Sequence, residues 1–289
     1  MFLRQSRIYH TARPEPATVT WGHEGDKTSM PVITLAKRLR RQALPILYRG
    51  ERYECPACGS ALRSFMAGGA KLPLFKEKKI IGAGYRQNNL CPSCWTTDRE
   101  RLILAFMLAR SVHVPAAGII LNIAPEPSLC RYFADQADVF HLRADLMRGN
   151  MSVIFDLQRM PLPDQSIDMV ICNHVLEHVE DDRIAMAEIL RVLKPGAAAL
   201  LQAPIAAHEA ETIEDPSVSD PAEREQRFGQ DDHVRLYGQD YASRIRNAGF
   251  DLDCVKWTEQ PELFGGAPER YGLNPEEILF LGKKPHEAV

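Results

Sequence analysis

The chain has 289 residues and a mass of 32.5 kDa, which suits one large domain or two modest ones. Apolar residues make up 45% and charged residues 25%, a balance that excludes wholesale disorder and makes disulfide staples unnecessary. No apolar run approaches the ~20 residues that a membrane helix needs, and residues 1–20 lack the apolar core of a secretory signal. We therefore expect a cytoplasmic protein with no transmembrane segment.

The net charge of −3 conceals an asymmetry along the chain. Residues 1–110 carry 19 Lys and Arg against 8 Asp and Glu, whereas residues 111–289 carry 16 against 30. A basic N-terminal region followed by an acidic region indicates two modules. The basic charges either bind an anionic partner or are simply solvated at the surface.

Residues 1–50 form an N-terminal extension that precedes any motif. Residues 1–31 show no periodicity, but Leu35, Leu39, Ala43 and Leu47 alternate with basic residues in an amphipathic pattern. Such a stretch either lies on a membrane surface or docks on the body of the protein. Its shortness and an internal proline favour docking.

Residues 51–96 contain the strongest metal signal in the chain. Cys55 and Cys58 form one C-x2-C pair, and Cys91 and Cys94 form a second. Each pair suits a tight turn that presents two thiolates to one metal ion, and two such turns complete a tetrahedral four-cysteine site. The spacing predicts a small zinc-binding module, because disulfides would suit a secreted miniprotein better.

The 32 residues between the two pairs leave room for a hairpin around residues 72–85. This spacer interleaves Lys and Arg with aromatic residues, and such side chains can contact phosphates and stack on bases. Nucleic-acid binding through residues 51–96 therefore stays open beside a simpler interpretation, in which the aromatic residues form the small core of the module.

A capping box from Thr97 to Glu100 opens a predicted linking helix within residues 97–117. In residues 118–284, apolar segments alternate with amphipathic ones, which predicts an α/β fold with a mostly parallel sheet covered on both faces. The expected strands span residues 119–124, 139–142, 153–155, 167–172, 197–203, 250–257 and 278–281. The expected helices span residues 128–136, 181–193 and 239–248.

Four consecutive blocks of this region, residues 156–164, 167–170, 174–178 and 191–196, resemble class I S-adenosylmethionine-dependent methyltransferases. The resemblance covers about residues 118–284 and implies a Rossmann-like seven-stranded methyltransferase sheet with a final antiparallel strand. Together with the four-cysteine module and the segment 95–102, the architecture is similar to a subset of these enzymes whose substrates are unassigned.

The resemblance also implies where the cofactor S-adenosylmethionine binds. Asp145, which follows the second strand, would accept hydrogen bonds from the two ribose hydroxyls. Asp156 would accept from the adenine amino group, with the amide of Leu157 against the ring. Asn173, which follows the fourth strand, would border the sulfonium and the acceptor pocket.

The family's first motif is a glycine-rich turn, but Ala124, Glu126 and Ser128 stand at its three glycine positions. One interpretation is that Ala124 still forms the turn and Glu126 reaches the ammonium group of the cofactor. The other is that the site is closed and the domain is not catalytic. Retention of Asp145 and Asp156 favours binding.

The insert 205–238 carries nine carboxylates and follows the fifth strand, where the family places substrate loops or lids. Its His233 is the first candidate for a catalytic base, and His174 is the second, because histidine titrates near neutral pH. His233 fits a purely structural role equally well. His174 and His178 also have the spacing of a metal pair.

We therefore expect an enzyme that transfers a methyl group from S-adenosylmethionine to an unidentified acceptor, a small molecule or a saccharide. Two alternatives stay open. One is an RNA methyltransferase that holds its substrate with the basic zinc module, and the other is a non-catalytic binding protein on the same scaffold.

Overall fold

The computed structural model describes residues 42–110, 112, 114–147 and 151–286. The amphipathic pattern expected in the N-terminal extension lies outside these residues up to position 41, and residues 42–47 are helical. Among the described residues, no helix is long and apolar enough to cross a membrane.

One seven-stranded sheet forms the centre of the fold, with the order β14-β15-β10-β9-β6-β7-β8. Its strands are β6 (Gly118–Ile123), β7 (Val139–Asp145), β8 (Val153–Ile154), β9 (Ile167–Asn173), β10 (Leu193–Gln202), β14 (Asp251–Val255) and β15 (Leu279–Lys283). Only β15 runs antiparallel to its neighbours, β10 and β14. The predicted Rossmann-like seven-stranded methyltransferase sheet is confirmed, including its antiparallel last strand.

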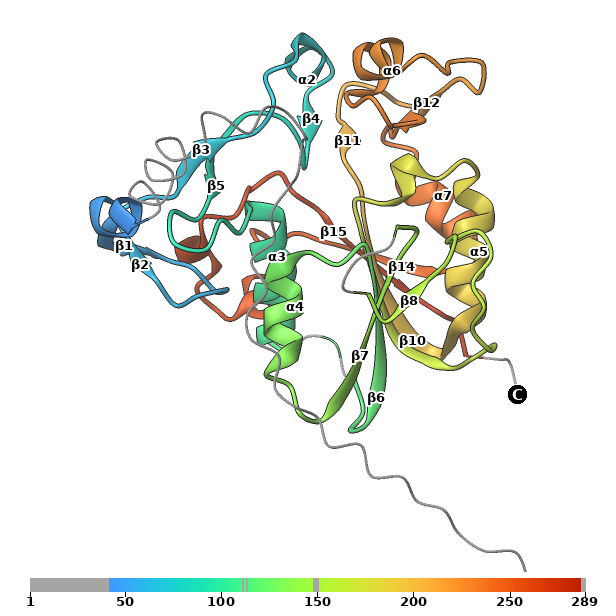
Figure 1. Ribbon diagram of the computed structural model, residues 1–289, viewed down its shortest axis with the longest axis horizontal. Coiled ribbons are helices and arrows are strands. Elements are labelled where there is room, and N and C mark those ends of the chain that lie inside the picture. Colours follow the sequence, from blue (N-terminus) through green and yellow to red (C-terminus); the bar gives the residue numbers. More distant parts are fainter. Residues whose placement is uncertain (1–41, 111, 113, 148–150, 287–289) are drawn as a thin grey trace, which may run out of the picture. The chain divides into compact units, whose positions relative to one another are not determined.

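Helices cover both faces of this sheet (Figure 1). They are α3 (Asp98–Leu108) and α4 (Pro127–Ala134) on one face, and α5 (Asp182–Val192) and α7 (Tyr241–Asn247) on the other. Strand β9 is buried along its whole length, and alternate residues face opposite cores: Met169 and Ile171 pack with α3 and α4, whereas Val170 and Cys172 pack with α5 and α7. This two-sided burial explains why β9 reads as a continuous apolar run.

The cysteine module consists of short elements ahead of α3. They are β1 (Arg49–Glu54), β2 (Ala61–Leu62), β3 (Met66–Gly68), α2 (Pro73–Glu77), β4 (Ile80–Ile81) and β5 (Arg86–Leu90). β1 pairs with β2, and β3 pairs with β5. The hairpin expected around residues 72–85 is wrong: Pro73 opens the helix α2 there, and β4 pairs with a strand from another part of the chain.

That partner strand is β11 (Ile205–Ala206), the first element of the acidic insert. The insert continues with β12 (Ile213–Glu214), α6 (Pro221–Phe228) and β13 (Arg235–Leu236), and β12 pairs with β13. An ion pair reinforces the junction, since Lys78 Nζ lies 2.7 Å from Glu209 Oε1 of the insert, and a second pair joins Lys79 Nζ to Glu276 Oε1, ahead of β15, at 2.5 Å. Part of the basic charge at the front of the chain is therefore neutralised within the molecule.

Helix α3 connects the module to the sheet through a buried guanidinium. Arg101 is fully buried, and its five N–H groups donate to five backbone carbonyls at 2.5–3.0 Å. These carbonyls belong to Asn88, Asn89, Thr96, Tyr271 and Gly272. The last two lie at the end of the 3₁₀ turn η3 (Pro268–Tyr271), which follows η2 (Pro261–Phe264). One side chain thus joins the cysteine module to the C-terminal part of the fold.

Replacing Arg101 by Lys should lower the free energy of unfolding by about 2–6 kcal/mol. Lysine has three N–H donors in place of five, and each buried carbonyl left unpaired costs about 1–3 kcal/mol. Denaturant unfolding of the full chain measures the change. Arg52→Lys on the exposed face of β1 is the matched control, and equal unfolding midpoints for the two variants would contradict the role of Arg101.

Candidate functional site

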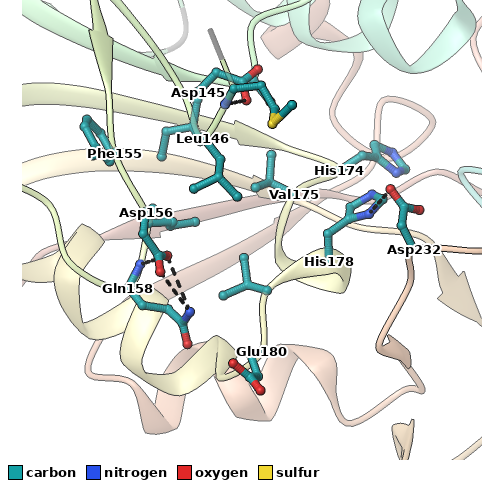
Figure 2. A pocket seen from close by; sticks show the side chains of 15 residues that line it. Asp145, Leu146, Phe155, Asp156, Gln158, His174, Val175, His178, Glu180 and Asp232 are labelled. Carbon is teal, nitrogen blue, oxygen red and sulfur yellow. Dashed lines mark hydrogen bonds and ion pairs between the residues drawn. The ribbon is translucent and has the colours of Figure 1, made fainter. Parts of the chain in front are cut away.

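A cavity of about 550 Å³ opens at the carboxyl ends of β6, β7, β8 and β9. Parallel α/β sheets bind ligands at this edge. Figure 2 shows Asp145 and Asp156 in one part of the cavity and His174 and His178 across from them. Its walls are formed by Ile123, Ala124, Asp145, Leu146, Met147, Phe155, Asp156, Leu157, Gln158, His174, Val175, His178, Val179, Glu180 and Asp232.

Two aspartates project from turns at the ends of adjacent strands. Asp145 ends β7, and its Oδ1 accepts from the amide of Met147 at 3.0 Å. Asp156 follows β8, and its Oδ1 accepts from the amide of Gln158 at 2.9 Å. Each bond closes an Asx turn that holds the carboxylate beside the cavity. The structure therefore brings both predicted aspartates, together with the buried Leu157, to one ligand-sized space.

The turn after β6 keeps a left-handed backbone without glycine. Ala124 has φ +46°, a conformation that costs a residue with a Cβ about 1–2 kcal/mol. Glu126 follows at the start of α4, where Pro127 is the first helical residue. Its Oε1 accepts from Nδ2 of Asn173 at 2.5 Å and lies 4.0 Å from Nε of Arg99 in α3. The motif retains the bend of a glycine-rich turn and adds a carboxylate.

The third glycine position is also occupied by a side chain that has a partner. Ser128 is buried and its hydroxyl donates to Oε2 of Glu100. The other carboxylate oxygen of Glu100 accepts from the backbone amide and the hydroxyl of Thr97, which completes the predicted capping box. Both side chains that replace glycine, Glu126 and Ser128, therefore face residues of α3.

Several buried polar atoms beside the cavity have no hydrogen-bond partner among the described residues. Six of the eight such side-chain atoms belong to Arg99, Glu126, Asn173, His174, Glu177 and Glu277. Their side chains are neighbours: Asn173 bonds Glu126, His174 Nδ1 lies 3.2 Å from Glu177 Oε1, and a Cβ on Gly82 would meet both Glu277 and His174. Buried polar atoms without partners are uncommon in folded proteins, so this group is a candidate binding site.

Two of these carboxyl groups have raised pKa values. Burial and the neighbouring Glu100 raise the pKa of Glu126 to about 7. Burial and the neighbouring Asp98 raise the pKa of Glu277 to about 7. Both groups can therefore exchange a proton near neutral pH, and both favour a cationic partner in the ionised form.

The two candidate histidines occupy different places. His174 lines the cavity, and burial lowers its pKa to about 4. His233 does not line it: this residue is 6% exposed, its Nδ1 lies 3.0 Å from the carbonyl oxygen of Phe228, and burial lowers its pKa. Its ring contacts that of His178, with 4.6 Å between the centroids. The insert is held mainly by the buried Arg235, which donates to three carbonyls of residues 176–180.

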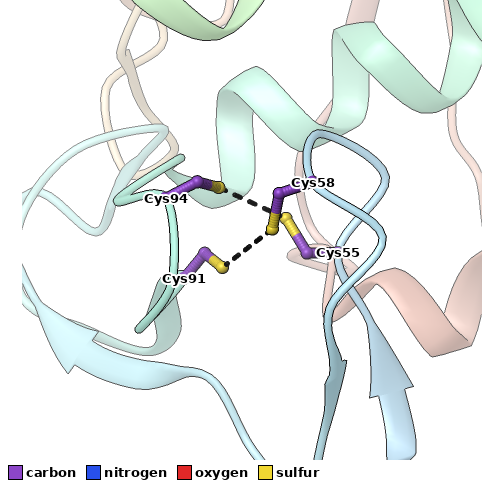
Figure 3. Close-up of side chains that lie close together, drawn as sticks. All are labelled: Cys55, Cys58, Cys91 and Cys94. Carbon is purple, nitrogen blue, oxygen red and sulfur yellow. Dashed lines mark hydrogen bonds between the residues drawn. The ribbon is translucent and has the colours of Figure 1, made fainter. Parts of the chain in front are cut away.

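A second group of ligand atoms lies in the cysteine module, where four thiols converge from two loops (Figure 3). Cys55 Sγ lies 3.7 Å from Cys94 Sγ, and Cys58 Sγ lies 3.8 Å from Cys91 Sγ. A tetrahedral zinc with Zn–S bonds of about 2.3 Å has S···S edges of about 3.8 Å. The four sulfurs thus have the spacing of one tetrahedral metal site.

The two loops have the same backbone design. The amide of Gly59 donates to the carbonyl of Cys55, and the amide of Trp95 donates to the carbonyl of Cys91. Gly59 has φ +67° and Trp95 has φ +65°, so each loop ends in a left-handed residue directly after its second cysteine. Glycine adopts this conformation readily but tryptophan does so rarely, and only the structure reveals the repeat.

The strand order and the position of the cavity define a Rossmann-like domain that binds its ligand at the carboxyl edge of the sheet. Residues 126–201 match the family described as a methyltransferase domain. This part of the chain, about a quarter of its length, is therefore similar to methyltransferase domains.

One curated relative is a probable S-adenosylmethionine-dependent methyltransferase from Mycolicibacterium smegmatis, 37% identical over 75 residues. The match covers 24% of this chain, which spans about a quarter (27%) of the length of that relative. Two solved structures are similar over 63% of the chain: YcgJ from Bacillus subtilis (17% identity, TM-score 0.41, 98% of that chain) and a methyltransferase in complex with the Haloferax volcanii Trm112 activator (18%, 0.41, 88%).

Sequence reasoning missed two residues beside the cavity, Arg99 and Glu277. Arg99 lies inside the capping segment of α3, where a charged residue reads as an ordinary helix surface. Glu277 precedes the last strand and reads as a turn residue. The direction of the Arg99 side chain becomes clear only once the packing of α3 on α4 is known. The sequence therefore offered no usable signal for Arg99 or for Glu277.

Proposed function

We propose that the chain transfers a methyl group from S-adenosylmethionine to an acceptor that enters beside the cysteine module. The observation that supports this most directly is the cavity at the carboxyl edge, which holds Asp145 and Asp156 in one part and adjoins buried, partnerless polar atoms in another. A nucleoside with an amino-acid tail offers groups that match both sets.

In this proposal, different residues bind different parts of the cofactor. Asp145 binds the ribose hydroxyls, and Asp156 with Leu157 binds the adenine. Glu126 and Asn173 bind the ammonium group, and Nε of Arg99, which has no hydrogen-bond partner among the described residues, binds the carboxylate. When bound, the cofactor supplies an electrophilic methyl group on a sulfonium, so the chain's main task is to align the acceptor.

The acceptor end is formed by His174, Glu277 and the backbone at Gly82 of the cysteine module. A Cβ at Gly82 would lie 2.9 Å from Glu277 Oε1 and 3.4 Å from His174 Cε1, so the module directly covers these two groups. Glu277, with a pKa of about 7, can take a proton from a hydroxyl acceptor near neutral pH. His174, which lines the cavity, remains the histidine candidate for this end, and the enclosure favours a small molecule or a saccharide.

A second candidate function is methylation of RNA. It is supported by a groove of about 770 Å³ in the cysteine module, lined by Lys71, Lys76, Phe75, Tyr85 and Arg86 among others. Lys71 Nζ lies 4.2 Å from the centre of the Tyr85 ring, and Tyr85 is 47% exposed. A salt-dependent RNA affinity would favour this candidate. A chain that binds no S-adenosylmethionine would support the non-catalytic alternative.

The four cysteines hold a structural zinc in this proposal. Their S···S spacing fits a tetrahedral ion, and four protein ligands leave no open coordination position for chemistry. The module has a small apolar core, built around Cys55, Leu62, Phe65 and Cys91, so the metal contributes much of its stability.

The purified chain should contain a tightly bound zinc that Cys91→Ser removes, since three thiolates cannot close the site. Elemental analysis of both proteins measures the metal, and unfolding should show a lower midpoint for the variant. Cys254→Ser, at an exposed cysteine outside the module, is the control and should retain the metal. Equal zinc in wild type and Cys91→Ser would contradict the assignment.

S-adenosylmethionine should bind the full chain, and Asp145→Asn should weaken binding by about 10- to 150-fold. This range corresponds to the loss of a hydrogen bond to a charged group, about 1.5–3 kcal/mol. Calorimetry measures the dissociation constants, and Asp251→Asn on the exposed start of β14 is the control. An unchanged constant for Asp145→Asn, or no binding by wild type, would overturn the cofactor assignment.

The affinity for S-adenosylmethionine should rise with pH up to about 7, because the ammonium group needs an ionised Glu126 and the pKa of this carboxyl is about 7. Well below pH 7 the dissociation constant should increase by about tenfold per pH unit. Above about 7.7–8.0 the cofactor's own amino group loses its proton and the affinity should fall again. Glu126→Gln should abolish the limb below pH 7, and an unaltered limb would exclude this contact.

Glu277→Gln should preserve S-adenosylmethionine affinity but slow methyl transfer to a hydroxyl acceptor by about 10²–10⁴-fold, the usual contribution of a general base. Transfer of labelled methyl groups to a panel of small-molecule acceptors provides the assay. The adjacent Glu276→Gln, at a half-exposed residue paired with Lys79, should retain the rate. Equal rates for both variants would remove Glu277 from the chemistry.

A further inference from the structure

A second cluster of metal-ligating side chains lies beside the cavity, far in sequence from the cysteines. Glu177, His178 and His233 each offer one ligand atom, and these three atoms lie within 4.8 Å of one another. Glu177 and His178 end the 3₁₀ turn η1 (Leu176–His178), and His233 comes from the acidic insert. We propose that these residues bind a divalent first-row transition metal ion, with zinc as the preferred ion.

Both histidines are oriented as metal ligands. Nδ1 of His178 lies 3.1 Å from the carboxylate of Asp232, and Nδ1 of His233 lies 3.0 Å from the carbonyl oxygen of Phe228. Each Nδ1–H is thus directed to an acceptor, which leaves the lone pair of Nε2 for a metal. Metal-binding histidines characteristically donate their other N–H to a carboxylate or a carbonyl in this way.

The third ligand is a buried carboxylate with one free oxygen. Glu177 is 1% exposed, and its Oε1 lies 3.2 Å from Nδ1 of His174. Its Oε2 has no hydrogen-bond partner among the described residues. A buried carboxylate oxygen without a donor is costly, and a cation beside it removes that cost. This orphaned oxygen is the observation, independent of the histidine pair, that indicates a cation.

The backbone holds the two segments together before any ion binds. The amide of Val234 donates to the carbonyl of Glu177 at 2.9 Å, and the buried Arg235 donates to the carbonyls of Leu176 and Val179. Ligand atoms around one tetrahedral zinc lie about 3.3 Å apart. The three side chains therefore need to approach by at most ~1.5 Å, which small side-chain rotations provide.

Two nitrogens and one carboxylate oxygen select the kind of ion. This donor set suits zinc and its neighbours in the first transition row, whereas calcium and magnesium prefer all-oxygen sites. Three protein ligands leave a coordination position open, as in catalytic zinc sites. His178 and Asp232 line the cavity, so the open position adjoins the acceptor end and could hold an oxygen of the acceptor. This last role rests on the proposed function, but metal binding itself does not.

The test is zinc stoichiometry of the full chain after equilibrium dialysis at fixed free zinc. Wild type should bind two zinc ions, Cys91→Ser one, and His178→Ala and His233→Ala one each with the cysteine site still filled. The retained cysteine zinc shows that each histidine variant is folded. His208→Ala, at an exposed histidine whose Nδ1 also lies 3.0 Å from a carbonyl oxygen, is the matched control and should bind two.

Asp232→Asn at the exposed carboxylate should raise the dissociation constant of the second zinc by about 10- to 100-fold, the usual effect of removing a group that orients a ligand. The site is overturned if wild type binds only the cysteine zinc and takes up no second equivalent of zinc, cobalt or manganese at saturation. It is also overturned if the second ion persists in both His178→Ala and His233→Ala. Either failure leaves the proposed function standing, because S-adenosylmethionine binding to the full chain with its cysteine site filled is measured separately.

Discussion

The buried guanidinium of Arg101 is the interaction on which the arrangement of this molecule depends. A charged group without solvent is tolerated only when its hydrogen-bonding groups are satisfied, and here each of the five donors has its own carbonyl. Three of those carbonyls flank the second cysteine loop, and two lie in the segment ahead of β15. The ring of Phe65 also packs 3.7 Å from the guanidinium carbon. The module and the sheet are therefore parts of one folded unit.

The same helix explains how the turn after β6 functions without glycine. In a glycine-rich turn the missing side chains leave room for a ligand, but here the side chains of Glu126 and Ser128 face Arg99 and Glu100 of α3. The helix that links the module to the sheet thus supplies the partners that the substituted motif requires. The two unusual features, an N-terminal module and a turn without glycine, are therefore connected through helix α3.

Much of the fold follows from local patterns in the sequence. The alternation of apolar strands and amphipathic helices predicts all seven strands within a few residues of their observed bounds. The signal is strongest for β9 and β10, which are buried on both faces and so have unbroken apolar runs. The C-x2-C spacing of the cysteine pairs likewise predicts their tight turns. By contrast, β4 has only two residues, Ile80 and Ile81, and its partner β11 lies more than 120 residues away. No local pattern encodes such a pairing.

The candidate site shows the same division. Asp145 and Asp156 follow strands directly, so the resemblance to a family positions them. Arg99, Glu177 and Glu277 acquire their roles only through packing, since each is a charged residue whose partners come from other segments. The sequence offered His233 as a base, yet its Nδ1 is engaged and its ring lies against His178, which makes ligation through Nε2 the better use of this residue. The role of each of these side chains therefore depends on which of its polar atoms lack a hydrogen-bond partner in the folded chain.

The pairing of β4 with β11 has a consequence for how an acceptor is chosen. It joins the cysteine module to the insert, and Gly82, which follows β4, lies against His174 and Glu277. A change in either peripheral element alters the acceptor end while Asp145 and Asp156, on the other side of the cavity, keep their geometry. In the proposed function, cofactor binding and acceptor selection thus belong to different parts of the chain.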